Sequence, residues 1–102
     1  MKRKNMKVEE IFSEDLKDKE FAAEYLRQCL EDGPDIFNIA VLNVAKANGN
    51  IAKLAEEVDL SRTSLYRSLG EDGKPAFASI YKILSVLGFK LDIVCDEDKE
   101  AA

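Results

Sequence analysis

Apolar residues recur at helical spacing along most of the chain, which predicts a bundle of amphipathic helices. The first such run lies between residues 18 and 33, with Asp18 as its N-cap and Gly33 as its end. The next begins at Pro34 and ends at Asn48, and its apolar face is wide enough for a nearly central helix. That face comprises Ile36, Phe37, Ala40, Val41, Val44 and Ala45, widened by Ile39 and Leu42.

Three shorter helices are predicted in the second half of the chain. Asn50 and Ser61 are the expected N-caps of the first two, and Gly88 ends the third. Glycine and proline break the helical pattern over residues 71–75, so this segment is expected to be a loop. The three helices should cover residues 50–58, 61–69 and 78–88.

Beyond Gly88 the pattern changes to a period of two. Residues 89–93 alternate between apolar and charged side chains, which predicts a short strand. A lone strand in a helical domain needs a partner strand, and a copy related by a two-fold axis is the simplest source of one.

These elements predict one all-α domain of five helices over residues 16–94, with a short C-terminal strand. A flexible arm over residues 1–15 should precede the domain, and a disordered acidic tail over residues 95–102 should follow it. A domain of this size buries a modest core, so dimerisation would help to stabilise it.

The pair of helices within residues 51–69 meets the demands of a helix-turn-helix. In that motif two helices cross steeply over a turn of three to four residues, so a small residue is needed at the crossing, here Ala55. The turn often has glycine where this chain has Asp59, and aspartate tolerates a left-handed backbone better than most residues. The apolar residues that would lock the pair together are Leu54, Val58, Leu60 and Leu65.

The second helix of this pair should be polar on its outward side, because it would enter the major groove of DNA. No acidic residue occurs between Leu60 and Leu69, although the chain contains 20 of them. Arg62 and Thr63 lie in the first turn, where side chains reach base edges, and Arg67 lies about one turn later. An arginine at such a place either pairs with guanine or holds a phosphate. The same spacing also fits an ordinary helical hairpin with a solvated polar face.

Other candidate residues flank this helix. Asn50 and Lys53 could hold the DNA backbone from the preceding helix, and Lys74 could do so from the loop. The ring of Tyr66 packs against Phe77 and the last helix, or its hydroxyl reaches a phosphate. The candidate DNA-binding residues are therefore Asn50, Lys53, Ser61, Arg62, Thr63, Ser64, Tyr66, Arg67 and Lys74.

The net charge of −5 argues against DNA binding until its distribution is considered. Residues 8–35 carry ten acids and three bases, and residues 92–102 carry five acids and one base. Residues 36–91, which include the predicted DNA-reading helices, carry seven bases and five acids. The acidic charge therefore lies mostly towards the two ends. Residues 1–7 hold four bases, which form either an ordinary charged terminus or an arm that contacts phosphates.

The composition argues against catalytic and metal chemistry. The chain has no histidine, no glycine-rich phosphate loop and no metal-ligand spacing, so we expect no enzyme activity, no cofactor and no metal. Cys29 lies on an apolar helical stripe and should be buried, whereas Cys95 should be an exposed thiol. We recognise no signal peptide and no membrane-spanning run, so a cytoplasmic protein without a membrane partner is expected.

The run L-S-R-T-S-L-Y-R-S-L-G-E-D-G-K-P-A-F over residues 60–77 is more specific than a bare helix-turn-helix. Together with its surroundings, from Leu16 to Leu91, it resembles the addiction-module antidote (antitoxin) proteins that carry a phage-repressor-like, Xre-type helix-turn-helix. The resemblance implies a five-helix, lambda-repressor-like domain that dimerises and binds operator DNA. It also implies a toxin partner, of the small basic RelE-like ribonuclease type, and repression of the shared operon. The chain departs from the pattern of this family at two positions. Asp59 replaces a common glycine, and Ala78 replaces a serine that would cap the last helix.

The resemblance gives the acidic N-terminal half a role, since acidic side chains could meet a basic toxin. Otherwise they form a solvated helix face. The acidic residues concerned are Glu9, Glu10, Glu14, Asp15, Glu20 and Glu24.

Two further functions stay open. A phage-type repressor would have no toxin partner, which a pull-down with the neighbouring gene product would reveal. A protein-interaction adaptor would not bind duplex DNA even at low salt.

Overall fold

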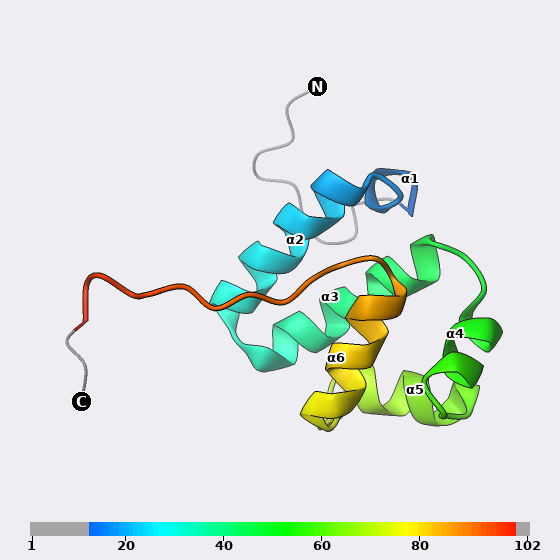
Figure 1. The fold of residues 1–102 in the computed structure, drawn as a ribbon. Coiled ribbons are helices and arrows are strands. Elements are labelled where there is room, and N and C mark those ends of the chain that lie inside the picture. The colour runs from blue at the N-terminus through cyan, green and yellow to red at the C-terminus, as the bar shows by residue number, and fades with distance from the viewer. Residues whose placement is uncertain (1–12, 100–102) are drawn as a thin grey trace.

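The computed structural model describes residues 13–99, which form six α-helices (Figure 1). The helices are α1 (Ser13–Leu16), α2 (Lys19–Asp32), α3 (Pro34–Ala47), α4 (Ile51–Glu57), α5 (Arg62–Leu69) and α6 (Phe77–Val86). The five predicted helices are all present, and the short α1 is an addition that begins inside the predicted arm. The rest of that arm, with Glu9 and Glu10, lies outside the described residues. No described helix is long and apolar enough to cross a membrane.

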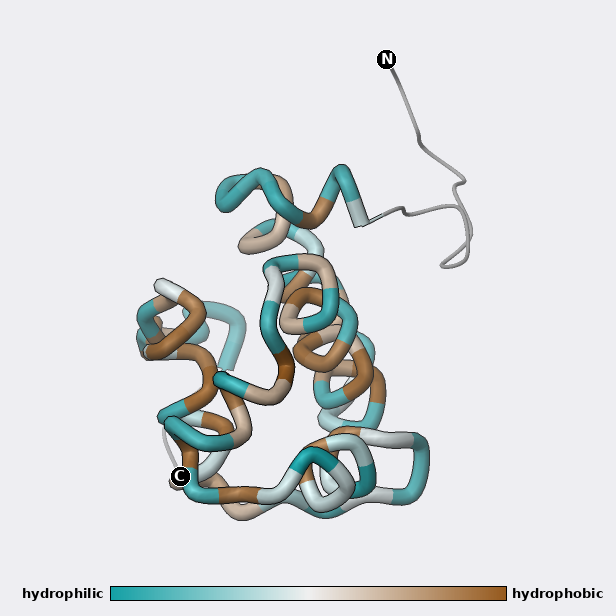
Figure 2. Tube along the Cα trace, turned by 90° about the vertical axis from the view of Figure 1, so that its right-hand side faces the viewer, coloured by the Kyte–Doolittle hydropathy of each residue, from teal (hydrophilic) through white to brown (hydrophobic). Residues whose placement is uncertain are grey.

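Helix α3 lies at the centre of the domain and contacts α1, α2, α4 and α5. The middle of its predicted apolar face is buried, whereas Ile39 and Leu42 are half-buried and Ile36 in the first turn is exposed. Hydrophobic stretches recur along the helices between polar ones (Figure 2). The largest fully buried side chains are Val41 and Val44 of α3, Leu65 and Leu69 of α5, and Ile83 of α6. The core therefore fixes α5 directly against the central helix.

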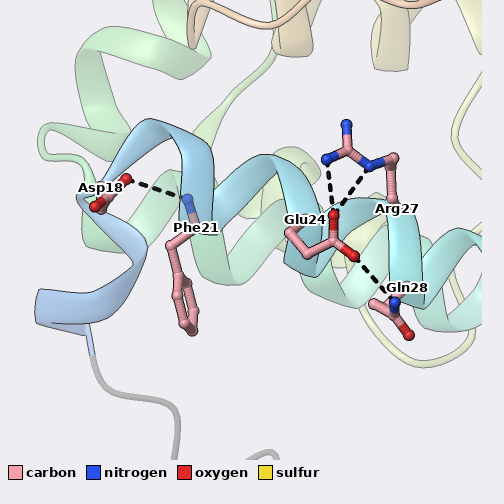
Figure 3. Close-up of polar contacts among 5 residues, drawn as sticks. All are labelled: Asp18, Phe21, Glu24, Arg27 and Gln28. Atoms are coloured by element: carbon pink, nitrogen blue, oxygen red, sulfur yellow. Dashed lines mark hydrogen bonds and ion pairs between the residues drawn. The ribbon is translucent and has the colours of Figure 1, made fainter. Parts of the chain in front are cut away.

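The predicted helix ends of α2 and α3 are confirmed. Asp18 caps α2, because its carboxylate accepts a hydrogen bond from the backbone N–H of Glu20 at 2.9 Å and one from that of Phe21 at 3.1 Å. Figure 3 shows the bond from Phe21. Gly33 ends α2 with a φ of 131°, a backbone conformation that L side chains rarely adopt. Pro34 then starts α3, where its missing N–H costs no helical hydrogen bond.

The additional helix α1 is held by a contact from far along the chain. The side-chain amide of Asn48 donates hydrogen bonds to the carbonyl oxygens of Leu16 and Val44, at 3.0 and 2.9 Å. Leu16 itself is buried in the core. Asn48 thus joins the end of α1 to the end of α3, and this tertiary contact stabilises a helix too short to persist alone.

The chain leaves α6 through a Schellman motif. Phe89 N–H donates to the carbonyl of Leu84 at 2.8 Å, Gly88 N–H donates to that of Ser85 at 3.0 Å, and Gly88 has a φ of 96°. The ring of Phe89 consequently packs against the core. The residues that follow are extended but form no strand, because residues 13–99 supply no partner strand for them.

The start of α6 suggests a stability test. Its N-cap is Ala76, in the extended conformation that a capping residue adopts, but it offers no side-chain acceptor. Ala76→Ser should raise the free energy of unfolding by about 1 kcal/mol, because the new hydroxyl can accept from an orphan N–H of the first turn. Thermal melts followed by circular dichroism measure this gain. Ala78→Ser is the matched control, since it lies inside the helix, and equal effects of both changes would contradict the assigned cap.

Candidate nucleic-acid interface

Helices α4 and α5 are joined by a turn whose backbone geometry is sharply defined. Leu60 N–H donates to the carbonyl of Ala55 at 2.8 Å, and Asp59 N–H donates to that of Glu56 at 3.2 Å. Together these bonds form a Schellman motif that closes α4. Asp59 adopts a φ of 63°, the only positive φ of a non-glycine residue among residues 13–99. The predicted left-handed aspartate is therefore confirmed.

The two helices pack as the sequence predicted. Leu54, Ala55 and Val58 of the first helix and its turn are buried, and Leu65 is completely buried. Leu60, which follows the left-handed Asp59, is half-buried against the same core. The small side chain of Ala55 lies within this contact, so α5 is held in one orientation relative to α4.

Helix α5 has one buried side and one polar side. Leu65 and Leu69 face the core, whereas Arg62, Thr63 and Arg67 are exposed. This division follows from the 3.6-residue period of the helix, because the two buried leucines are four positions apart. The result is a short, rigidly anchored helix with an exposed side that is polar and carries two arginines.

The first turn of α5 is fixed by two serines. Ser61 is the N-cap, and its hydroxyl oxygen accepts a hydrogen bond from the backbone N–H of Ser64 at 2.9 Å. The two hydroxyl groups are also hydrogen-bonded to each other at 3.0 Å. Ser61 is exposed and Ser64 is half-buried. Both therefore serve the local structure of α5, and neither is an unengaged polar group.

Asn50 and Lys53 lie in the first turn of α4. The side-chain oxygen of Asn50 accepts from the backbone N–H of Lys53 at 3.0 Å, so Asn50 is the N-cap that the sequence predicted. Lys53 is exposed, as are the nearby acids Glu56 and Glu57. The polar side of α4 is thus of mixed charge, unlike that of α5.

Within the described part of the chain, none of the basic candidates is engaged by a carboxylate. Within residues 13–99 the ion pairs are Lys17–Glu14 and Arg27–Glu24, and neither involves α4, α5 or the loop after them. Arg62 and Arg67 are therefore available to an external anion without first breaking an internal pair. That availability matters because an arginine already bound to a carboxylate would have to exchange it for a phosphate.

The loop after α5 is packed tightly against the end of that helix. A Cβ on Gly73 would overlap the carbonyl oxygens of Ser68 and Arg67, so glycine is required here for close approach rather than for an unusual φ. Gly73 N–H also donates to the carbonyl of Gly70 at 3.0 Å. This contact holds the exposed Lys74 next to the end of α5.

Tyr66 packs differently from the first of its two predicted arrangements. It is half-buried against the core, and the ring paired with Phe77 is that of Tyr81, with 6.3 Å between centroids. Phe77 and Tyr81 lie one turn apart on α6, and both are exposed. The expected Tyr66–Phe77 pair is thus replaced by a pair within α6.

Comparison with known proteins identifies the family of the chain. Residues 7–95 match the family described as probable addiction module antidote protein. The chain belongs to this antidote family. A protein of Haemophilus influenzae that carries the description "uncharacterized" is 30% identical over 70 residues, which cover 68% of this chain and 71% of that protein. No solved structure matches the chain.

Away from α5, the antidote carries an acidic surface on α2. The Glu24 carboxylate accepts hydrogen bonds from Arg27, at 2.7 and 3.2 Å, and from Gln28 at 3.0 Å (Figure 3). The hydrogen bond from Gln28 and then the charge-assisted contact with Arg27 lower the pKa of Glu24. Glu14 and Glu20 are exposed, and Glu14 pairs with Lys17. These contacts therefore favour the ionised form of the Glu24 carboxylate.

The two cysteines of the antidote lie as the sequence predicted. Cys29 is buried and Cys95 is exposed. Burial raises the pKa of the Cys29 thiol, and the nearby charge of Asp32 raises it further. The described residues contain no cluster of three or more potential metal ligands. Cys29 is thus a core residue whose thiol stays protonated.

Sequence reasoning missed two positioning residues of the antidote. Gly73 fixes the loop to the end of α5, and Asn48 ties α1 to α3. The glycine belongs to the E-D-G-K-P run, but a pattern cannot distinguish a turn glycine from one required for close approach. Asn48 was assigned only as part of a helix end, and nothing local indicates its contact with Leu16.

Proposed function

We propose that this antidote binds double-stranded operator DNA, with α5 as the recognition helix of an Xre-type helix-turn-helix in a lambda-repressor-like domain. One observation carries the proposal. Arg62, Thr63 and Arg67 project from a helix whose opposite side is fully buried, and neither arginine has a carboxylate partner in the described structure. A rigid helix with an exposed basic side suits the major groove of DNA.

The remaining candidates have supporting positions in this proposal. Ser61 and the free amides at the start of α5 face a phosphate, and Lys53 and Asn50 contact the backbone from α4. Lys74 contacts a phosphate beyond the end of α5, where Gly73 holds it. Tyr66 is half-buried, so only its hydroxyl is assigned a DNA contact. Ser64 supports the first turn.

Selection from a random duplex library followed by footprinting tests this proposal. A protein that binds through α5 should select one defined site and protect it, with strong dependence on salt concentration. Failure to select a site, together with no binding to long random duplex at low salt, would overturn the proposal and favour the adaptor function. Selection of a site without any toxin partner would favour a phage-type repressor.

The antidote family implies a toxin partner in general. We propose that this partner is a small basic protein of the RelE-like ribonuclease type, that the acidic surface of α2 contacts it, and that the two proteins together repress their operon. The support is complementary charge, since Glu20 is exposed on α2 without an ion pair among residues 13–99. Glu24 is also exposed on α2, and its carboxylate would exchange Arg27 for a basic group of the toxin. The family suggests a regulatory rather than a catalytic role.

Charge reversal on α2 should weaken this association. The double variant Glu20→Lys, Glu24→Lys should slow association with the product of the adjoining gene by about tenfold or more at low salt, because steering by opposite charge is lost. Surface plasmon resonance at several salt concentrations measures the rate. The control Glu56→Lys, Glu57→Lys makes the same charge change on α4. An equal loss in both variants would contradict a contact at α2.

A further inference from the structure

Residues 89–94 form an extended segment that the single chain leaves without a partner. In the described structure the backbone groups of residues 90–92 make no hydrogen bond to other elements, and Ile93 N–H reaches only the neighbouring Asp92 carboxylate, at 2.8 Å. The side chains of Ile93 and Val94 are 94% and 79% exposed. An extended backbone with free ladder groups and exposed β-branched side chains is a template for strand pairing.

An apolar groove lies beside this segment. In Figure 1 the segment leaves α6 and passes α2 towards the edge of the domain. The floor of the groove between segment and helix is apolar, and charged side chains such as Glu24, Arg27 and Glu31 of α2 also line it. Its apolar residues include Leu26, Leu30, Phe37, Leu84, Phe89 and Leu91. Leu30 is 52% exposed there, although it belongs to the apolar stripe of α2. An unpaired strand and an uncovered apolar surface thus lie side by side.

The charge pattern of the segment favours a second copy of the same chain as the occupant. In an antiparallel pair centred on Leu91, the two Leu91 residues face each other and each Lys90 faces Asp92 of the other copy. Both cross-strand charge pairs are then of opposite sign, which stabilises the pair. A parallel pair in register would instead place Lys90 beside Lys90 and Asp92 beside Asp92.

The opposite face of the same register is apolar. Phe89, Leu91 and Ile93 share it, because side chains alternate between the faces of a strand. Phe89 is already packed against its own core, and Ile93 of the other copy would lie across from it, above the groove. Ile93, the most exposed large apolar residue among residues 13–99, would therefore be covered by the other domain in each copy.

We propose that two copies of the antidote associate through an antiparallel ribbon of residues 89–93, centred on Leu91. The ribbon supplies the dimer that binding to a two-fold symmetric operator requires, and in that sense the inference deepens the proposed DNA-binding function. The association itself needs no DNA, so it is tested in its absence. A monomeric protein that still selects a DNA site would overturn this inference alone.

Charge reversal tests both the ribbon and its register. Lys90→Glu places acids opposite Asp92, and Asp92→Lys places bases opposite Lys90, so each variant should dimerise about tenfold more weakly than the parent protein. An equimolar mixture of the two variants restores opposite charges at both pairs and should form a heterodimer. The double variant Lys90→Glu, Asp92→Lys should dimerise like the parent. Sedimentation velocity over a concentration series measures all four samples.

Two controls keep the test decisive. Lys46→Glu makes the same charge change as Lys90→Glu, but on α3, so it should leave dimerisation unchanged. Circular dichroism should show the same helix content in every sample. Leu91→Pro should remove the dimer, because proline cannot donate to the ladder. A monomeric parent protein, or single variants that dimerise like the parent, would overturn the ribbon. If the single variants dimerised weakly and their mixture formed no heterodimer, the register would be overturned.

Discussion

Arg62→Ala should weaken binding to the selected DNA site by about 1–3 kcal/mol, with the loss concentrated at one base pair. Arg62 lies in the first turn of α5, where a recognition helix reaches base edges, and it is exposed and free of a carboxylate partner among residues 13–99. A bidentate arginine–guanine contact discriminates against the other base pairs by this amount. Binding to a panel of single-base variants of the site, measured by fluorescence anisotropy, shows where the loss falls.

Arg67→Ala should weaken binding to all these duplexes alike. Arg67 lies in the last turn of α5, beyond the turn that reads bases, so we assign it to a phosphate. Loss of one phosphate contact should reduce the slope of log K against log salt by about one. A salt titration of each variant therefore separates the two arginines by mechanism as well as by affinity.

Lys17→Ala is the matched control for both changes. It removes the same charge where α1 meets α2, which Figure 1 places away from α5, and its ammonium group pairs with Glu14. This variant should bind every duplex as the parent protein does. If the α5 variants also bound like the parent, the recognition helix would be wrongly assigned, whereas equal losses in all three would indicate attraction by net charge alone.

The local sequence predicted those features that local chemistry determines. Asp18, Asn50 and Ser61 are caps because each carries a short side-chain acceptor just before an apolar helical run. Asp59 could be recognised as the left-handed turn residue because it stands where a small helix ends and another begins. The division of α5 into a buried and a polar side follows from its periodicity in the same way.

Features that depend on distant parts of the chain were not predictable. Helix α1 has only four residues and no periodicity, and it is held by Asn48, which is 32 positions away. Ala76 caps α6 without a capping side chain, so no residue type marked that position. The strand predicted after Gly88 is absent from residues 13–99, because a period of two in one short segment does not supply the partner strand that a ladder requires.

The candidate interface was predictable in part. Exposure of Arg62, Thr63 and Arg67 followed from the helical pattern, because the buried positions of α5 were clear. The ring partner of Phe77 was predicted wrongly, although Tyr81 lies four positions further along the same helix, a spacing at which helical side chains meet. Periodicity therefore predicted which residues of α5 face solvent, whereas the partner of Phe77 is determined by a local contact within α6.

Leu65→Ala should lower the free energy of unfolding by about 2–5 kcal/mol, a large fraction of the stability of a domain of this size. Leu65 is completely buried where α5 meets α3 and α4, and truncation leaves a cavity that the close-packed neighbours fill only in part. Urea titrations followed by circular dichroism measure the change, and the slope of unfolding free energy against urea should stay the same.

Thr63→Ala on the same helix is the counterpart of this variant. Thr63 is exposed, so its truncation should change the unfolding free energy by no more than about 0.5 kcal/mol. If α5 reads DNA, Thr63→Ala should nevertheless weaken binding to the selected site. At low temperature, where Leu65→Ala is folded, this second variant should keep the DNA-contacting residues of α5 in place and retain much of the affinity for that site. A stability loss below about 1 kcal/mol for Leu65→Ala would mean that the leucine does not anchor α5. A DNA affinity unchanged by Thr63→Ala would place the base-reading surface on other residues of the helix.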